Sequence, residues 1–196
     1  MLPSGYTRLE YIQNAASTYV NTSIIPQADD IEMNIRYYCG SLGSNYIFQS
    51  RASTSGHVFG LSGSQSGATI VAGWDGAATR STISREIGHI YNLNLRLNNG
   101  TMTLRVIDET TGQENTVSTD YTWAEPASPF GIFGNASGNR IGAGQRVFSV
   151  WMKVNGQYIM NYIPATYNDA VGFYDSVSQT FKEATVGSFV AGPAVN

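Results

Sequence analysis

The feature that most limits how this chain folds is a repeated alternation of apolar and polar residues with a period of two. Apolar residues occupy every second position in 31–37, 91–97 and 102–106. Such alternation is typical of a β-strand that buries one face and exposes the other. Asn99-Gly100 separates the last two segments, and Asn155-Gly156 stands between two further apolar segments. Asn-Gly is a strong β-hairpin signal, because both residues tolerate the positive φ of a type I′ turn.

Shorter segments with the composition of strands fill much of the remaining chain. They are residues 8–12, 18–24, 46–50, 57–61, 68–73, 116–119, 130–133, 172–174, 180–182 and 188–190. No segment keeps a helical period of 3.6 residues. Many short strands joined by turns indicate a sandwich or a barrel, and two packed sheets suit a chain of 196 residues. We therefore predict an all-β fold with two antiparallel sheets, and a single domain over residues 1–196.

Charge and hydropathy exclude several classes of function. The net charge is −3 and there is no run of Lys and Arg, whereas nucleic-acid binders usually carry a basic stripe. The same pattern argues against an anionic membrane surface. No apolar run approaches the roughly 20 residues that span a bilayer. Residues 1–5 lack the charged and apolar regions of a secretory signal, so we expect a removed signal or another route, such as packaging in a virion.

Seven motifs, in order along the chain, resemble a known family. They are Leu-Pro-Ser-Gly-Tyr-Thr-Arg-Leu-Glu-Tyr-Ile (2–12), Thr-Tyr-Val-Asn-Thr (18–22), Phe-Gly-Ile-Phe (130–133), Arg-Val-Phe-Ser-Val (146–150), Tyr-Ile-Pro-Ala (162–165), Val-Gly-Phe-Tyr-Asp (171–175) and Ser-Phe-Val-Ala-Gly-Pro (188–193). Together they resemble the concanavalin A-like and laminin-G-like domains of phage tail proteins and gut-bacterial surface proteins. The resemblance implies a jelly-roll sandwich with a lectin-like role in adhesion or glycan recognition. Residues 41–86 match poorly, and there we expect the variable ligand surface.

Catalytic patterns are weak in this chain, and we predict that it is not an enzyme. A retaining glycosidase needs two carboxylates about 5–5.5 Å apart, which a Glu-x-Asp pattern on one strand would supply. That pattern is missing. Asp30 and Glu32 have the right spacing but no third acid, and we interpret Asp108, Glu109 and Glu114 as solvated acids beside a turn. No Gly-x-Ser-x-Gly motif accompanies His57 or His89.

Metal and cofactor signals are equally sparse. Two histidines and Cys39 stand far apart and give no zinc spacing, and we expect Cys39 to be a buried small hydrophobe. The resemblance allows calcium, which related domains hold through Asp and loop carbonyls. Asp29, Asp30 and Asp169 are the candidates, although the better interpretation of these aspartates is that they form turns. We predict no other cofactor.

Aromatic residues beside loops are the candidates for ligand binding, because flat rings stack on sugars while polar neighbours bind the hydroxyls. The predicted site lies on an exposed sheet face or its rim and consists of Trp74, Arg51, Tyr46, His57 and Trp151. Trp151 alternates with Val150 and Met152, which we assign to the core together with Phe148, so its side chain should point outward. Arg51 and Gln49 should share the face opposite Tyr46 and Phe48. For Trp123 a role as a lid on the hydrophobic core is favoured.

Three functions remain open from the sequence. The first is a carbohydrate- or host-receptor-binding module on a phage particle or bacterial surface, hence in a virion or at the cell surface. The second is a structural virion or fibre domain whose exposed aromatic residues contact other virion subunits. The third and most distant is a glycoside hydrolase, which paired acids facing each other in a cleft would support.

Overall fold

The computed structural model describes residues 2–15, 18–42, 46–51, 58–63, 69–134 and 142–195. Every regular element in these residues is a β-strand, and the strands form a large sheet and a small sheet. The main path of the large sheet runs β11 (Gln113–Asp120), β10 (Thr101–Asp108), β9 (Ile90–Asn98), β4 (Ile31–Tyr38), β13 (Arg146–Val154), β14 (Gln157–Tyr167), β15 (Ala170–Asp175) and β16 (Thr180–Glu183). Its remaining strands are β1 (Tyr6–Arg8), β2 (Ile12–Asn14) and β17 (Phe189–Ala191).

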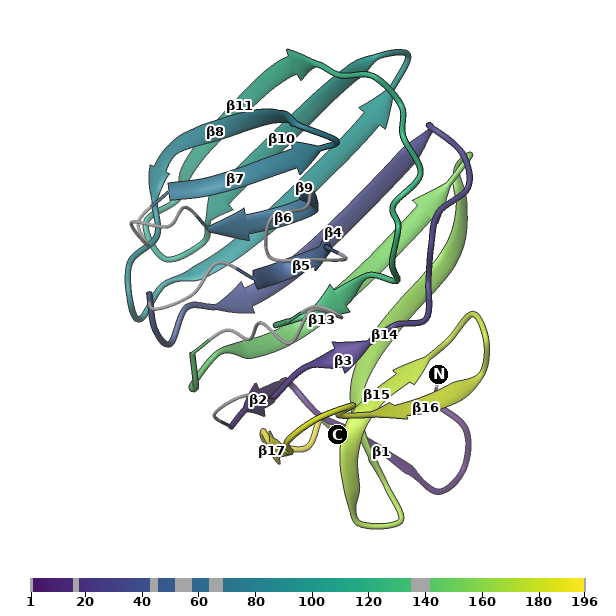
Figure 1. The fold of residues 1–196 in the computed structure, drawn as a ribbon. Coiled ribbons are helices and arrows are strands. Elements are labelled where there is room, and N and C mark those ends of the chain that lie inside the picture. The colour runs from purple at the N-terminus through teal and green to yellow at the C-terminus, as the bar shows by residue number, and fades with distance from the viewer. Residues whose placement is uncertain are drawn as a thin grey trace.

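The small sheet lies in front of the large one in Figure 1. Its order is β3 (Val20–Asn21), β12 (Gly131–Ile132), β5 (Tyr46–Ser50), β6 (Phe59–Gly63), β7 (Thr69–Trp74) and β8 (Ala77–Ser84). The strand pairings in the described part of both sheets are antiparallel, as in the predicted all-β sandwich. We call the side of each sheet that is turned away from the other sheet its outer face.

The core fills the space between the sheets, and each long strand contributes alternate residues to it. Ile31, Met33 and Ile35 of β4 are fully buried there, as are Leu93 and Leu95 of the neighbouring β9. Cys39 is also buried, as the sequence predicts. The period of two in the sequence therefore decides which residues face the core and which form the two outer faces.

Both predicted Asn-Gly hairpins are present. Asn99 and Gly100 have φ of 49° and 77°, and Asn155 and Gly156 have φ of 49° and 74°. Positive φ at both central residues is the backbone of a type I′ turn. The first turn joins β9 to β10, and the second joins β13 to β14.

Phe148 corrects one prediction about the core. The pairing of β13 with β4 shifts register between Val147 and Ser149, so Val147 enters the core and Phe148 does not. On the outer face the guanidinium of Arg36 lies 4.4 Å from the Phe148 ring centre. A bulge inserts one residue, and the side chains on either side of it change phase.

Strand β8 is a second departure from the sequence prediction, which passed over residues 77–84. Its buried positions are Thr79, Ser81 and Ile83. Because two of these three inward side chains are polar, the apolar alternation that indicates a strand is missing.

Among the described residues no helix is long and apolar enough to cross a bilayer.

Candidate functional site

The structure separates the predicted ligand-binding residues instead of gathering them. Trp74 lies in the core, Tyr46 and Arg51 belong to the small sheet, and Trp151 lies on the outer face of the large sheet. His57 lies outside the described residues. The small sheet and the large sheet therefore offer two different candidate surfaces.

The prediction for Trp74 is wrong. Its side chain is 0% exposed, and its indole Nε1 donates a hydrogen bond to the carbonyl oxygen of Ala124 at 3.0 Å. Its ring stacks on Trp123 at 5.3 Å, and Trp123 covers the edge of the core as predicted. Trp74 is the last residue of β7 and keeps the inward phase of Ile70 and Ala72, so a loop after a tryptophan does not by itself make the ring accessible.

Tyr46 corrects a second prediction. The pairing of β5 with β6 shifts register between Tyr46 and Phe48, and Tyr46 pairs with Ser62 while Phe48 pairs with the core residue Leu61. Directly paired residues point to the same side of a sheet. Tyr46 consequently lies on the outer face with Gln49 instead of opposite it. Arg51 follows β5 two positions after Gln49, and both Tyr46 and Arg51 are half-buried.

Paired positions across the outer face of the small sheet form a row that is almost bare of side chains. We call it the glycine row, and its members in order from β3 to β8 are Asn21, Gly131, Gln49, Gly60, Gly73 and Ala78. Glycine inside a strand often marks a place where another molecule approaches the backbone closely. The sequence contains this signal, since Gly60 and Gly73 lie in the predicted strands 57–61 and 68–73.

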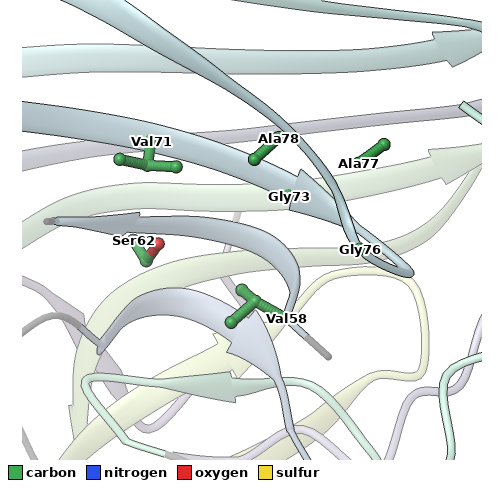
Figure 2. A pocket seen from close by; sticks show the side chains of 7 residues that line it. All are labelled: Val58, Ser62, Val71, Gly73, Gly76, Ala77 and Ala78. Atoms are coloured by element: carbon green, nitrogen blue, oxygen red, sulfur yellow. The ribbon is translucent and has the colours of Figure 1, made fainter. Parts of the chain in front are cut away.

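A hollow of about 240 Å³ lies over the part of the glycine row next to β8. Figure 2 shows the side chains around it. Its lining residues are Val58, Ser62, Val71, Gly73, Gly76, Ala77 and Ala78. A Cβ placed on Gly73 would lie 3.2 Å from the carbonyl oxygen of Val58 and 3.5 Å from its Cβ, so the glycine lets Val58 pack closely against this strand at the border of the hollow.

Gln49 is the long side chain in the glycine row, and its environment is unusual. The residue is 1% exposed. Neither its Nε2 nor its Oε1 has a hydrogen-bond partner in the part of the chain that the structure describes. A buried amide without partners costs on the order of 1–3 kcal/mol, and buried polar groups are nearly always paired in proteins. Gln49 therefore holds donor and acceptor capacity that the described residues do not use.

The outer face of the large sheet is built differently. Trp151 points outward there as the alternation predicts, but the ammonium of Lys153 lies 4.8 Å from its ring centre and Tyr158 packs against it at 5.7 Å. Lys153 also pairs with Glu32 at 3.3 Å, and Asn94 donates to the same carboxylate. Further pairs on this face are Asn34–Asn92, Arg36–Glu109, Arg105–Glu114 and Thr103–Ser118.

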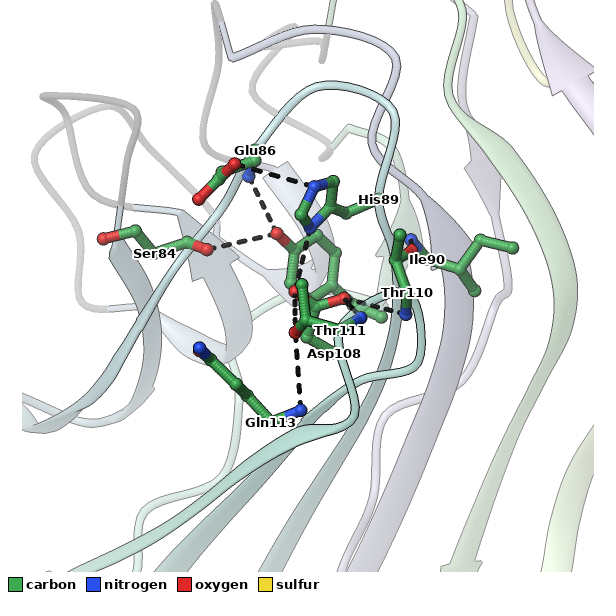
Figure 3. A network of polar contacts seen from close by, with 9 residues as sticks. Ser84, Glu86, His89, Ile90, Asp108, Thr110, Thr111 and Gln113 are labelled. Atoms are coloured by element: carbon green, nitrogen blue, oxygen red, sulfur yellow. Dashed lines mark hydrogen bonds and ion pairs between the residues drawn. The ribbon is translucent and has the colours of Figure 1, made fainter.

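A polar network at one end of the large sheet contains His89, one of the two histidines of the chain. Figure 3 shows this network, in which His89 Nδ1 lies 2.8 Å from Asp108 Oδ2 and His89 Nε2 lies 3.6 Å from Glu86. Asp108 Oδ1 and Oδ2 also accept hydrogen bonds from Thr110 and Thr111. Burial acts to raise the pKa of Asp108, but the hydrogen bonds from His89 and the two threonines lower it below its ordinary value.

The network has a structural role, because it ties the segment after β8 to the turn after β10. The amide of Glu86 donates to the Tyr91 hydroxyl at 2.8 Å, and this hydroxyl donates to the carbonyl of Ser84. Both ring nitrogens of His89 face carboxylates, so the geometry orients the ring toward acids and not toward a hydroxyl nucleophile.

The other acids considered from the sequence are in contact with cations or in turns. Glu109 pairs with Arg36 at 2.7 Å, and Glu114 pairs with Arg105 at 2.7 Å. Asp169 has φ of 65° and stands in the turn between β14 and β15. Within the described ranges, no group of three or more His, Cys, Asp or Glu side chains is arranged to hold a metal ion.

Comparison with solved structures places this fold among known sandwiches. A candidate carbohydrate-binding protein from Bacteroides ovatus has a TM-score of 0.62 at 12% identity, over 96% of this chain and 62% of that one. Tailspike protein 2 of an Escherichia coli O157:H7 bacteriophage has a TM-score of 0.47 at 17% identity, over 68% of this chain and 21% of the tailspike. A serum-amyloid-P-like pentraxin from Limulus polyphemus has a TM-score of 0.47 at 10% identity, over 89% of this chain and 96% of that one.

The similarity to the Bacteroides ovatus protein shows the fold and nothing finer. The chain spans less than two thirds of the Bacteroides ovatus protein and about a fifth of the tailspike. No protein-family model matches the sequence, and no curated protein sequence matches it. The chain is thus an all-β protein with two antiparallel sheets in a jelly-roll-like sandwich.

Proposed function

We propose that this chain is a non-catalytic carbohydrate-binding module that binds its ligand on the outer face of the small sheet. One observation carries the proposal. The buried amide of Gln49 lacks a partner among the described residues, and it stands in the same row as the hollow over Gly73. A primary amide can donate and accept hydrogen bonds, as sugar hydroxyls do.

The surroundings of the hollow support a sugar as ligand. Val58 and Val71 offer apolar surface to the C–H face of a ring, while Ser62 offers a hydroxyl. Mostly apolar sites with a few placed polar groups are typical for small ligands. The fold is shared with a candidate carbohydrate-binding protein. We infer that the ligand is a glycan of a host or receptor surface, which places the module on a virion or at a cell surface.

The surroundings of the acids support a role without catalysis. Glu109 and Glu114 are each paired with an arginine on the large sheet, away from the hollow. Aspartates in turns give no reason for a bound ion, so we expect ligand binding that does not depend on calcium.

A glycan array tests the proposal directly. The wild-type chain is applied with calcium and with a chelator, beside two variants that each introduce an isoleucine, one on each outer face. Ala78→Ile places a branched side chain at the exposed edge of the hollow. Thr116→Ile makes a similar change on the outer face of the large sheet, where Thr116 is exposed opposite Arg105. We expect specific glycan capture by the wild type and Thr116→Ile, and at least a tenfold loss in Ala78→Ile. Equal capture by all three would place the site elsewhere.

A second candidate function is assembly with other virion subunits. An aromatic cluster at the β1, β14 and β16 end of the large sheet favours it, since Tyr6 stacks on Tyr167 at 4.4 Å and Tyr167 packs near Phe181. Tyr167 remains 37% exposed, and exposed aromatic groups are frequent at protein interfaces. Sedimentation equilibrium of the wild type and Tyr167→Ser tests this. A self-association that Tyr167→Ser abolishes, together with a blank glycan array, would favour assembly.

A further inference from the structure

Charge is distributed unequally between the two sheets. The described strands of the small sheet contain no Asp or Glu, and Arg80 on the edge strand β8 is the one charged side chain in them. On the large sheet Arg36, Arg105 and Lys153 each pair with a carboxylate. Every Asp and Glu of the chain lies in the described ranges, and none of them pairs with Arg80. The carboxylates of the chain therefore leave this cation uncompensated.

Arg80 stands beside the hollow on the outer face of the small sheet. Val71 pairs with Ser62 on one side and with Arg80 on the other, and directly paired residues point to the same side of a sheet. Both Ser62 and Val71 line the hollow, as does Ala78, which precedes Arg80 by two residues, or about 7 Å along the strand. Ala78 and Arg80 are both exposed. The hollow is thus within reach of a solvent-exposed guanidinium.

The opposite end of the hollow carries the opposite charge. Ala77 lines the hollow and also a second pocket, whose lining includes Asp75 and Asp120. Along the turn and strand β8 the order is Asp75, Ala77 and Arg80, so the aspartates lie at one end and the arginine at the other. An anionic group on a bound molecule is attracted toward Arg80 and repelled from the aspartates.

We propose that the hollow takes an acidic sugar residue, whose carboxylate or sulfate group is bound by the guanidinium of Arg80. A guanidinium holds its N–H donors in a planar fork that fits such oxyanions, and hydrogen bonds between charged partners are stronger than those between neutral groups. Val58 and Val71 are left for the C–H face of the ring. The inference rests on the proposed function, because it names the class of ligand for the same hollow.

Paired charged and uncharged forms of the same glycans test the inference. The array presents glycans that end in glucuronic acid, N-acetylneuraminic acid or a sulfated hexose, each beside its methyl ester or its sulfate-free form, which separates the two oxyanions. Arg80→Gln removes the proposed contact. Arg96→Gln makes the same change of charge on the outer face of the large sheet, where Arg96 is exposed on β9, and serves as the control.

We expect the wild type and Arg96→Gln to capture at least one acidic glycan at least tenfold more strongly than its uncharged form. Arg80→Gln should lose this preference, and capture by the wild type should weaken between 50 and 500 mM NaCl, because salt screens exposed charges. Arg80 is exposed and has no carboxylate partner among the described residues, so Arg80→Gln should unfold at the same temperature as the wild type. A loss of capture then reports on the contact and not on folding.

The other outcomes separate this inference from the proposed function. Equal capture of the acidic and uncharged forms, still lost in Ala78→Ile, would overturn the inference and leave a carbohydrate-binding module. An equal loss of acidic glycans in Arg80→Gln and Arg96→Gln would show a general effect of net charge and overturn the contact with Arg80. A blank array would overturn both the proposed function and the inference.

Discussion

The two outer faces of this sandwich differ in whether their polar side chains have hydrogen-bond or ion-pair partners. On the large sheet the polar side chains pair with one another, as Lys153 does with Glu32 and Arg105 with Glu114. On the small sheet the glycine row is nearly bare, and the buried amide of Gln49 has no hydrogen-bond partner in the described residues. The first face is complete without a ligand, whereas the second contains a cost that a ligand would remove. Exposed aromatic residues would favour the large sheet as the ligand site, whereas the cost of the unpaired Gln49 amide favours the small sheet.

The two tryptophans that the sequence analysis treated alike give the largest expected contrast. Trp74 is fully buried and hydrogen-bonded, so Trp74→Ala should lower the free energy of unfolding by about 3–5 kcal/mol. Trp151 is half-buried on the large sheet and contacts Lys153 and Tyr158. Trp151→Ala should cost less than about 1 kcal/mol. Guanidinium unfolding of both variants checks this, and similar costs would remove the distinction between core and surface.

These residues also show what the sequence could predict. The two Asn-Gly turns and the alternating strands followed from local pattern, because a period of two and a positive-φ pair are local properties. Trp74 was predictable in the same way, since it is in phase with Ile70 and Ala72. The prediction of an accessible ring rested instead on the loop that follows Trp74.

Other features depend on neighbours that are distant in the chain. The bulges near Ile47 and Phe148 reverse the side to which side chains point, and a local pattern does not reveal an inserted residue. The glycine row unites residues from six segments, so it exists only once the strands are in register. Gln49 stands in the predicted strand 46–50, but the lack of a partner for its amide among the described residues follows from the folded surroundings and not from local sequence.

The network of His89 and Asp108 can be compared with Gln49, because the Asp108 carboxylate is buried but has hydrogen-bond partners. Asp108→Asn removes the carboxylate that His89, Thr110 and Thr111 bind, and it should cost about 2 kcal/mol at neutral pH. The folded chain lowers the pKa of Asp108, so the stabilisation is fully present above the unfolded value of about 4. It is lost as the pH falls through the lower folded pKa.

Unfolding measured between pH 2 and pH 7 tests the Asp108 prediction. The wild type should lose stability below about pH 4, and Asp108→Asn should lose less over the same range. Thr116→Asn on the exposed outer face serves as the control and should follow the wild type. Parallel acid profiles for the wild type and Asp108→Asn would contradict a role of this carboxylate in acid stability.

Gln49→Met is the change in which stability and function should move in opposite directions. Methionine has a similar length and no amide, so the unpaired polar atoms disappear while the packing volume is kept. We expect a gain of about 1 kcal/mol in the free energy of unfolding, together with a loss of glycan binding of at least tenfold. A destabilised Gln49→Met would mean that the amide has a stabilising partner, and the main argument for the small sheet would be lost.

Glu32→Gln should produce the smallest effect and tests whether the large sheet is a solvated surface of paired charges. Glu32 binds Lys153 at 3.3 Å and accepts from Asn94 at 3.2 Å, with both charged side chains partly exposed. Exposed pairs contribute less than about 1 kcal/mol and are screened by salt. The substitution should therefore change stability by a few tenths of a kcal/mol at low salt, less at 1 M NaCl, and leave glycan capture unchanged. If this variant lost glycan capture with unchanged stability, Glu32 would contact the ligand. The ligand site would then lie on the outer face of the large sheet, beside Trp151, and not on the small sheet.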